Sequence, residues 1–359
     1  LVTSKVYYKQ KHESQFKEVN DFRLNSLFVE FKKEFKGISQ GDFHSLLKSD
    51  VCTPYNPFEE YFSNLPEWDT KTDYIEQLSN TITTDDKSFW NTYFKKWLVG
   101  VVSCLLTKND NHMVLIFVGN QGIGKTTWLN NLLPKELNDY LYMGTINNNK
   151  DSQINLSECM FINIDEFETI GNKGLKQLKS IITQKHIRIR RPYGKIYESL
   201  PRRASFMASV NDYKFLVDST GNRRFLVVET NEIDINHKVD IHKVYSQCLY
   251  LLKNDFRHYL NTEEIIKVSE KNEKYRIYTF EEQLLLKNFK VPKKGKGKVL
   301  CTSDVLDIIS QRHKIYPNNT HLINLGRAFS KNGFKKGRTK NKRWGWWVVE
   351  RKPKRKNDI

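Results

Sequence analysis

The chain has 359 residues, enough for two or three domains, and carries 59 Lys and Arg against 41 Asp and Glu. The resulting formal net charge of +18 favours a polyanionic partner such as nucleic acid, although a generally Lys-rich proteome would produce a similar excess. The five cysteines include no C-x-x-C pair, which argues against a zinc site or a disulfide framework and indicates a reducing, cytoplasmic setting.

The N-terminal part of the chain shows helical patterns and no evident chemistry. Residues 1–55 combine aromatic and charged residues at helical spacing, which predicts an N-terminal helical region. Residues 56–110 form a lead-in that we expect to pack on the next domain through helices over 73–82 and 88–106. The apolar run 97–106 is shorter than the roughly 20 residues that span a bilayer, so no membrane partner is expected. No charged-then-apolar leader opens the chain, so secretion is not expected either.

A glycine-rich turn at residues 119–126 is the strongest motif in the chain. It lies between a predicted strand over 113–118 and a predicted helix over 127–133, the context in which G-x-x-x-x-G-K-[ST] binds a nucleoside triphosphate. Backbone N–H groups of such a turn point inward, and the helix N-terminus adds its positive dipole end. We therefore expect ATP, with Lys125 on the β- and γ-phosphates and the Thr126 hydroxyl on Mg²⁺. The predicted nucleotide-binding residues are Gly119, Asn120, Gln121, Gly122, Ile123, Gly124, Lys125, Thr126 and Thr127.

Strand and helix patterns alternate after this turn. The expected elements are buried strands over 159–164, 204–210 and 225–228, with helices over 175–182 and 239–259. This alternation predicts an α/β domain over 111–262, with a parallel sheet covered by helices on both faces.

Polar residues follow two of these strands directly. A carboxylate at the end of a strand beside the phosphate-binding turn can hold Mg²⁺, the role that we predict for Asp165. Glu166 can polarise the attacking water, and Glu168 is a poorer candidate for either role. A solvated strand end is the alternative interpretation of these acids. Asn211 closes the next strand, where its amide can orient the water against the γ-phosphate, although Asn also suits a turn.

Two arginines precede the last strand of the domain. Arg223 or Arg224 can project from the subunit edge and stabilise transition-state charge in a neighbour's site, as arginine fingers do. A pair of surface arginines is the alternative. The sequence does not decide between the two residues, because neighbours on a strand point to opposite faces.

Basic and apolar residues alternate over 185–197 around a Pro-Tyr-Gly turn. This pattern predicts a basic β-hairpin, inserted between the acidic strand and the strand that ends at Asn211. Its charges can bind phosphates and its tyrosine can stack on a base, whereas a solvated charged hairpin is the alternative. The predicted DNA-binding residues of the hairpin are Arg188, Arg190, Arg191, Tyr193 and Lys195.

The C-terminal part of the chain has a different composition. Residues 263–298 are predicted to be a helix and a linker, because a Lys/Gly/Pro stretch occupies 290–298. Over 299–359 we expect a helix with its N-cap at 302–304, a helix over 320–330 and a strand over 344–349, the order of a winged-helix domain. The basic loop before this strand is predicted to contact duplex DNA at or near an origin through Lys335, Lys336, Arg338, Lys340, Lys342 and Arg343.

These motifs resemble the virulence-associated E family, ATPases of phages and mobile islands that are similar to superfamily 3 helicases. The resemblance rests on residues 119–126, 165–166, 191–194 and 218–225 and covers roughly residues 56–260. It implies an AAA+ P-loop ATPase core that works as a hexameric ring and unwinds DNA.

The resemblance also implies roles for single residues. It makes Lys125 and Thr126 the phosphate and Mg²⁺ ligands, and it gives the second acidic motif to Asp165 and Glu166. Further implied roles are the sensor position for Asn211, the trans-acting finger for Arg223 or Arg224, and the DNA-tracking tip for the hairpin near Lys195.

We therefore predict an ATP-dependent replicative helicase of a phage or mobile element that translocates on single-stranded DNA. The alternative is an origin-binding initiator or regulator in which ATP only switches assembly and no strands are separated. A DNA-packaging or loading ATPase is a third hypothesis.

Overall fold

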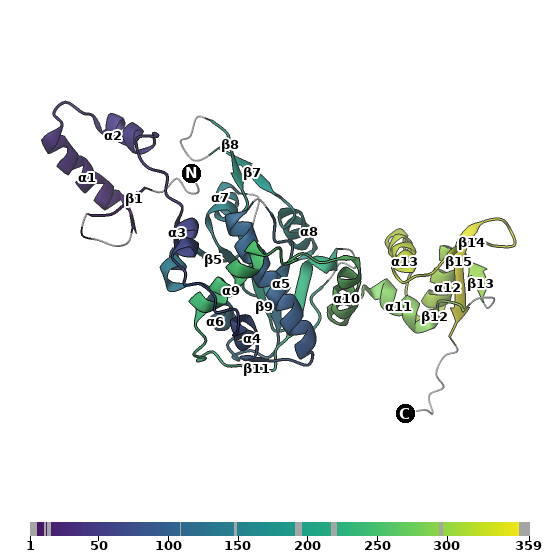
Figure 1. Ribbon diagram of the computed structural model, residues 1–359. Helices are drawn as coiled ribbons and strands as arrows, with labels where there is room; N and C mark the ends of the chain where they lie inside the picture. Colours follow the sequence, from purple (N-terminus) through teal and green to yellow (C-terminus); the bar gives the residue numbers. More distant parts are fainter. Residues whose placement is uncertain are drawn as a thin grey trace. The chain divides into compact units, whose positions relative to one another are not determined.

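The computed structural model describes residues 6–10, 12, 16–107, 109–146, 149–190, 196–216, 221–293 and 297–351. The chain divides into two compact units, one with residues 1–213 and 221–274 and the other with residues 214–220 and 275–359 (Figure 1). The predicted DNA-binding residues Arg191, Tyr193 and Lys195, and the part of the arginine motif at 218–220, lie outside the described residues.

A five-stranded parallel sheet forms the centre of the first unit. In spatial order its strands are β10 (Phe225–Glu229), β4 (Val114–Val118), β9 (Ser205–Val210), β6 (Phe161–Ile164) and β5 (Leu141–Met143). Every residue of β4, β6 and β9 is buried, so these strands appear in the sequence as continuous apolar runs rather than alternating ones. The predicted α/β class with a parallel sheet is confirmed.

Aromatic side chains fix the main helix on one face of this sheet. α5 (Lys87–Leu106) begins after Asp86, whose carboxylate accepts a hydrogen bond from the backbone N of Phe89. The Trp97 ring stacks on Phe161 of β6 at 5.9 Å between centroids, and the Trp90 ring meets Phe117 of β4 at 5.6 Å. The same core includes residues of α3 (Pro57–Ser63), α4 (Tyr74–Ser79), α6 (Lys125–Asn130), α9 (Ile241–Lys253) and α10 (Thr262–Asn272).

The first unit contains several shorter elements. These are β1 (Tyr7–Tyr8), β2 (Lys17–Glu18), α1 (Asp21–Glu34), α2 (Gln40–Leu47), β3 (Ile82–Thr83), η1 (Lys135–Tyr140), α7 (Lys150–Glu158), η2 (Phe167–Thr169), α8 (Asn172–Ile181), β7 (His186–Ile189), β8 (Glu198–Pro201), η3 (Asn222–Arg224) and β11 (Glu232–Ile233). Within the described N-terminal residues, a short β1–β2 ladder accompanies the expected helices. The helix expected over 73–82 ends at Ser79, because Ile82 pairs with Ile233 of β11.

The long helix predicted over 239–259 is wrong beyond residue 253. α9 ends at Lys253. Two residues further on, Asp255 has a φ of +56°, and the backbone N of Phe256 donates to Leu251 O. α10 then starts anew, because Asn261 and Glu264 form a capping box.

The second unit packs helices against an antiparallel sheet. Its elements are α11 (Phe280–Asn288), β12 (Phe289–Lys290), β13 (Lys298–Leu300), α12 (Thr302–His313), α13 (Asn319–Lys331), β14 (Lys336–Arg338) and β15 (Trp344–Glu350). η4 (Glu273–Tyr275) crosses the boundary between the two units in the chain. β12, β13 and β14 all pair with β15. The N-cap of α12 is Cys301 rather than a residue of 302–304. Leu285 and Phe289 are fully buried in the core, so this unit begins before the Lys/Gly/Pro stretch. In the described part of the chain, no helix combines the length and apolarity that crossing a membrane requires.

Candidate functional site

The loop between β4 and α6 needs glycine at three places. Gly122 and Gly124 have φ values of +82° and +90°, in the left-handed region that other residues rarely adopt. A Cβ atom at Gly119 would lie only 2.3 Å from the carbonyl oxygen of Thr230, and one at Gly124 would lie 2.6 Å from Ile235 Cγ2. The loop can therefore keep this close, folded-back path only with glycines at these positions.

The ammonium group of Lys125 lies inside this loop and is bonded to neutral oxygens. Its Nζ donates to Gly119 O at 2.8 Å, Asn120 O at 2.7 Å and Asn211 Oδ1 at 3.0 Å. Burial lowers the pKa of Lys125, and the negative charges of Glu168 and Asp165 oppose that shift. None of the three acceptors is charged, so an anion that replaced one of them would form a stronger, charge-assisted bond.

Three side-chain oxygens meet beside the lysine. Ser209 Oγ donates to Asp165 Oδ1 at 2.6 Å, Thr126 Oγ1 lies 3.1 Å from Ser209 Oγ, and Thr126 Oγ1 lies 3.4 Å from Asp165 Oδ1. They come from the end of β9, the residue after β6 and the first turn of α6. Carboxylate and hydroxyl oxygens are the ligands that Mg²⁺ prefers, so this cluster fits the predicted ion. The sequence prediction missed Ser209, although it stands one step before the end of the strand that precedes Asn211.

Glu166 and Glu168 differ in their surroundings. Glu166 is exposed and has a φ of +51°, a left-handed conformation that costs a non-glycine residue about 1 kcal/mol or more. Glu168 is half-buried, and its Oε1 accepts a hydrogen bond from the backbone N of Asn211 at 3.2 Å. Its Oε2 is buried without a hydrogen-bond partner among the described residues. Glu168, the poorer candidate from the sequence, is thus the acid that contacts Asn211.

Arg223 and Arg224 lie at the amino ends of the strands, opposite the carboxyl ends where the Lys125 cluster lies. They belong to the 3₁₀ turn η3 just before β10, which pairs Phe225 with Val114 and Glu229 with Val118. At about 3.3 Å per residue, the strands separate the arginines from the loop after β4 by roughly 13 Å. The structure therefore does not bring them to the Lys125 cluster of the same chain. The argument that the two arginines face opposite sides of a strand is wrong, because they lie in a turn, where Arg223 is exposed and Arg224 half-buried.

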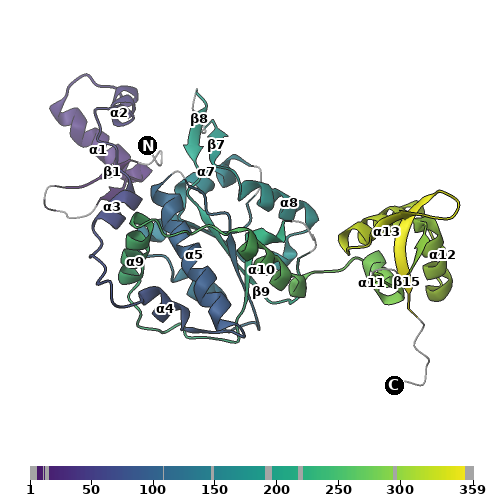
Figure 2. The same cartoon turned by 45° about the vertical axis from the view of Figure 1, so that its right-hand side comes forward.

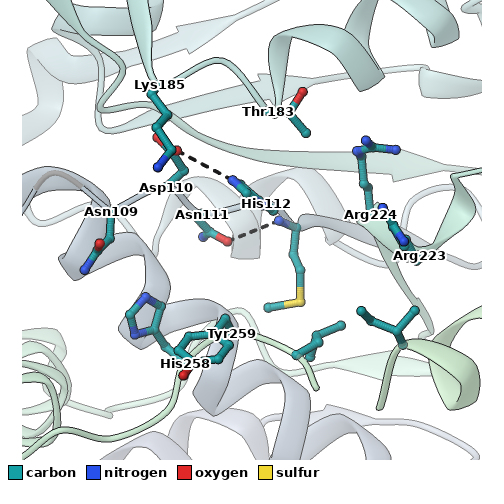
Figure 3. A pocket seen from close by; sticks show the side chains of 13 residues that line it. Asn109, Asp110, Asn111, His112, Thr183, Lys185, Arg223, Arg224, His258 and Tyr259 are labelled. Atoms are coloured by element: carbon teal, nitrogen blue, oxygen red, sulfur yellow. Dashed lines mark hydrogen bonds and ion pairs between the residues drawn. The ribbon is translucent and has the colours of Figure 1, made fainter. Parts of the chain in front are cut away.

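Both arginines line a cavity of about 550 Å³ that the sequence did not predict (Figure 3). Figure 3 shows them together on one side, with His258 and Tyr259 on another. Burial lowers the pKa of His258. The remaining lining residues are Asn109, Asp110, Asn111, His112, Met113, Thr183, Lys185, Leu260 and Ile265.

The predicted basic hairpin is confirmed as a pair of antiparallel strands. β7 and β8 pair His186 with Pro201 and Ile189 with Glu198, and they follow β6 and precede β9 in the chain. Figure 2 shows the hairpin projecting from the body of the first unit. Arg188 and Arg190 are exposed, whereas Ile187 and Ile189, which alternate with them, are buried.

The basic loop of the second unit forms a hairpin of β14 and β15. Lys335, Lys336, Arg338 and Lys340 are all exposed on it. The guanidinium of Arg338 lies 4.9 Å from the centroid of the Trp344 ring.

A parallel sheet with polar side chains gathered outside the carboxyl ends of its strands defines an α/β protein of the kind that binds its ligand at that edge. The family model described as "Virulence-associated protein E-like domain" matches residues 62–277, and the chain belongs to this family. This membership associates the chain with the replication of phages and mobile elements.

Solved structures share the fold at low sequence identity. An A-form apo structure of the NrS-1 C-terminal region (305–718) has a TM-score of 0.51 at 16% identity, with 96% of this chain and 94% of that chain covered. A second apo structure of the same region has a TM-score of 0.52 at 14% identity, with 97% and 94% covered. No curated protein sequence matches the chain.

Proposed function

We propose that the chain is an ATP-dependent DNA helicase for the replication of a phage or mobile element. The observation that supports it most directly is the meeting of Lys125, Thr126, Asp165, Ser209 and Asn211 at the carboxyl edge of the sheet. These residues come from separate strands and one helix, and each has a group suited to a phosphate, to Mg²⁺ or to a water molecule.

The proposed chemistry at this cluster is ATP hydrolysis. Lys125 would exchange a carbonyl oxygen for a phosphate oxygen of ATP. Thr126 and Asp165, with Ser209 beside them, would hold Mg²⁺, which neutralises charge on the β- and γ-phosphates when it is bound. Glu166 is the proposed residue that polarises the attacking water, Asn211 would orient that water, and Glu168 is a second candidate for Glu166's role.

The proposed assembly is a hexameric ring of an AAA+ P-loop ATPase. One chain carries the nucleotide loop at the carboxyl ends of its strands and the exposed Arg223 at their amino ends. The loop and the arginine could therefore contact the same ATP only if they came from two copies. Such a head-to-tail contact repeats around a closed ring. The transition-state charge on ATP would then be stabilised by an arginine of the neighbouring copy.

Two basic hairpins would contact DNA. The β7–β8 hairpin, with Arg188 and Arg190 exposed, is proposed to track single-stranded DNA, and the second unit is proposed to be a winged-helix domain that contacts duplex DNA.

Strand displacement on a forked DNA substrate tests the proposal. We expect the wild type to separate strands only with ATP and Mg²⁺, Lys125→Ala to separate none, and Lys135→Ala, which removes an exposed lysine, to behave as the wild type. Hydrolysis of ATP in the presence of DNA without any strand separation would rule out the helicase.

The exposed basic hairpin of the second unit also suits an origin-binding initiator in which ATP only switches assembly. Changing Arg188, Arg190 and Lys195 to Ala separates the two functions. In a helicase, ATP turnover persists and unwinding collapses. In an ATP-switched initiator, origin binding and turnover persist and no activity is lost.

A further inference from the structure

The β14–β15 hairpin of the second unit leaves two large aromatic rings in solvent. Trp344 is 64% exposed and Trp347 is 42% exposed, whereas Trp346 between them is buried in the core. Indole rings are usually buried, because they remove a large apolar area from water. Two exposed tryptophans on one short strand, one on each face, therefore indicate that this hairpin has a binding role.

The backbone next to Trp347 is shaped to receive the ring. Trp347 points away from the core face of β15, and Gly337 of β14 lies beside it. A Cβ atom at Gly337 would lie only 2.5 Å from Trp347 Nε1 and 2.9 Å from Cδ1. The indole therefore lies over the backbone of β14, where any side chain would displace it. Glycine inside a strand often marks such a close approach.

Trp344 extends the other face of the strand beyond the core. It shares that face with Trp346 and Val348, both buried, but has no core to enter. Arg338, on the paired strand, places its guanidinium 4.9 Å from the ring centroid. The ring is thus held in position while most of its surface stays in water.

The charge around these rings selects the partner. No Asp or Glu occurs between Asp307 and Glu350. The six cations of residues 335–343 make no ion pair with a described residue, and they are Lys335, Lys336, Arg338, Lys340, Lys342 and Arg343. An apolar partner would have to remove water from these cations without compensation, whereas phosphates would pair with them.

We propose that the tryptophans and cations of this hairpin bind single-stranded DNA, with bases stacked on Trp344 and Trp347 and phosphates on the cations. In a duplex the flat faces of the bases are covered by their neighbours, so only unpaired bases can stack on an indole. This inference goes beyond the duplex contact proposed above and does not depend on unwinding.

The test measures binding of the full chain, without ATP, to labelled oligo(dT) and to a duplex of equal length. Base stacking on an aromatic ring contributes about 1–3 kcal/mol, so W344A combined with W347A should weaken oligo(dT) binding at least about fivefold. Duplex binding should change less than about twofold, because the phosphate contacts are kept.

Two variants control for fold and for exposed aromatic rings in general. W344F keeps a ring that can stack and should keep most of the oligo(dT) affinity. Y316A removes the 93% exposed Tyr316 of the same unit and should change neither affinity. Unchanged oligo(dT) binding by the double variant would overturn the proposal. Equal losses of affinity for duplex and for oligo(dT) would also overturn it, as would a loss of oligo(dT) affinity in W344F as large as that in W344A. Because no ATP is present, these outcomes are independent of helicase activity.

Discussion

The carboxylate of Glu168 is the most informative single group near the nucleotide loop. One oxygen accepts from the backbone of Asn211, the residue whose side chain accepts from Lys125, and the other is buried without a described partner. A buried carboxylate oxygen that lacks a donor is costly, so a water molecule or a ligand group is the natural partner for it. Glu166, in contrast, is exposed and held in a left-handed conformation.

Exchanging each acid for its amide distinguishes their roles. We expect Glu166→Gln to lower the rate of ATP hydrolysis at least about 100-fold with ATP binding kept, because an amide cannot accept the proton of the water. Glu168→Gln should lower it less than about tenfold, because the amide oxygen can still accept from Asn211 N. Steady-state hydrolysis and fluorescent-nucleotide binding measure the two effects, and the opposite ranking would assign the role to Glu168.

Sequence motifs predicted the residues of this cluster that belong to a fixed pattern or end a strand, such as Lys125 and Asp165. Ser209 and the Glu168 contact could not be predicted, because they depend on which strands lie side by side. β9 lies between β4 and β6, and only that order brings Ser209 next to Asp165.

Among the elements, the capped junction between α9 and α10 shows how local polar groups end a helix that periodicity would continue. Both segments have apolar residues at helical spacing, so the pattern alone favours one long helix. The left-handed Asp255 and the reciprocal bonds of Asn261 and Glu264 interrupt it.

Removing this cap should destabilise the first unit by a measurable amount. Asn261→Ala leaves the Glu264 backbone N without its side-chain acceptor, which we expect to lower the free energy of unfolding by about 1 kcal/mol. Asn236→Ala, at an exposed position, is the control and should change it by less than about 0.5 kcal/mol. Chemical denaturation followed by circular dichroism measures both, and equal effects would contradict the role of the cap.

The strands of the parallel sheet separate two sets of charged groups. Lys125 and Asp165 lie at the carboxyl ends of the strands, and Arg223 and Arg224 lie at their amino ends. Buried apolar runs were enough to predict four of the five parallel strands, because residues buried on both faces leave a strong signal. β5 was missed, because none of its three residues is buried. The cavity that Arg223 and Arg224 share with His258 could not be predicted, because its walls come from four separate segments, within 109–113, 183–185, 223–224 and 258–265, which only the fold brings together.

Mixing two inactive variants tests whether these two edges meet between copies. Lys125→Ala and Arg223→Ala should each lose nearly all hydrolysis, since an arginine in trans contributes about 10³-fold or more. An equal mixture should recover activity, because roughly a quarter of the contacts in a randomly mixed ring join an intact loop to an intact arginine. Mixing Lys125→Ala with Thr126→Ala, both altered at the same edge, should recover none. Recovery in neither mixture would contradict the proposed arrangement.

The register of β10 on β4 has a consequence for when the proposed ATPase would be active. The strands between the two edges are stiff and fully covered, so a lone chain has no way to fold its own arginine back onto its own loop. Under the proposed function, copies that do not contact one another would not hydrolyse ATP. Consumption would begin only when enough protein has accumulated for neighbours to meet, which would tie the onset of activity to gene dosage.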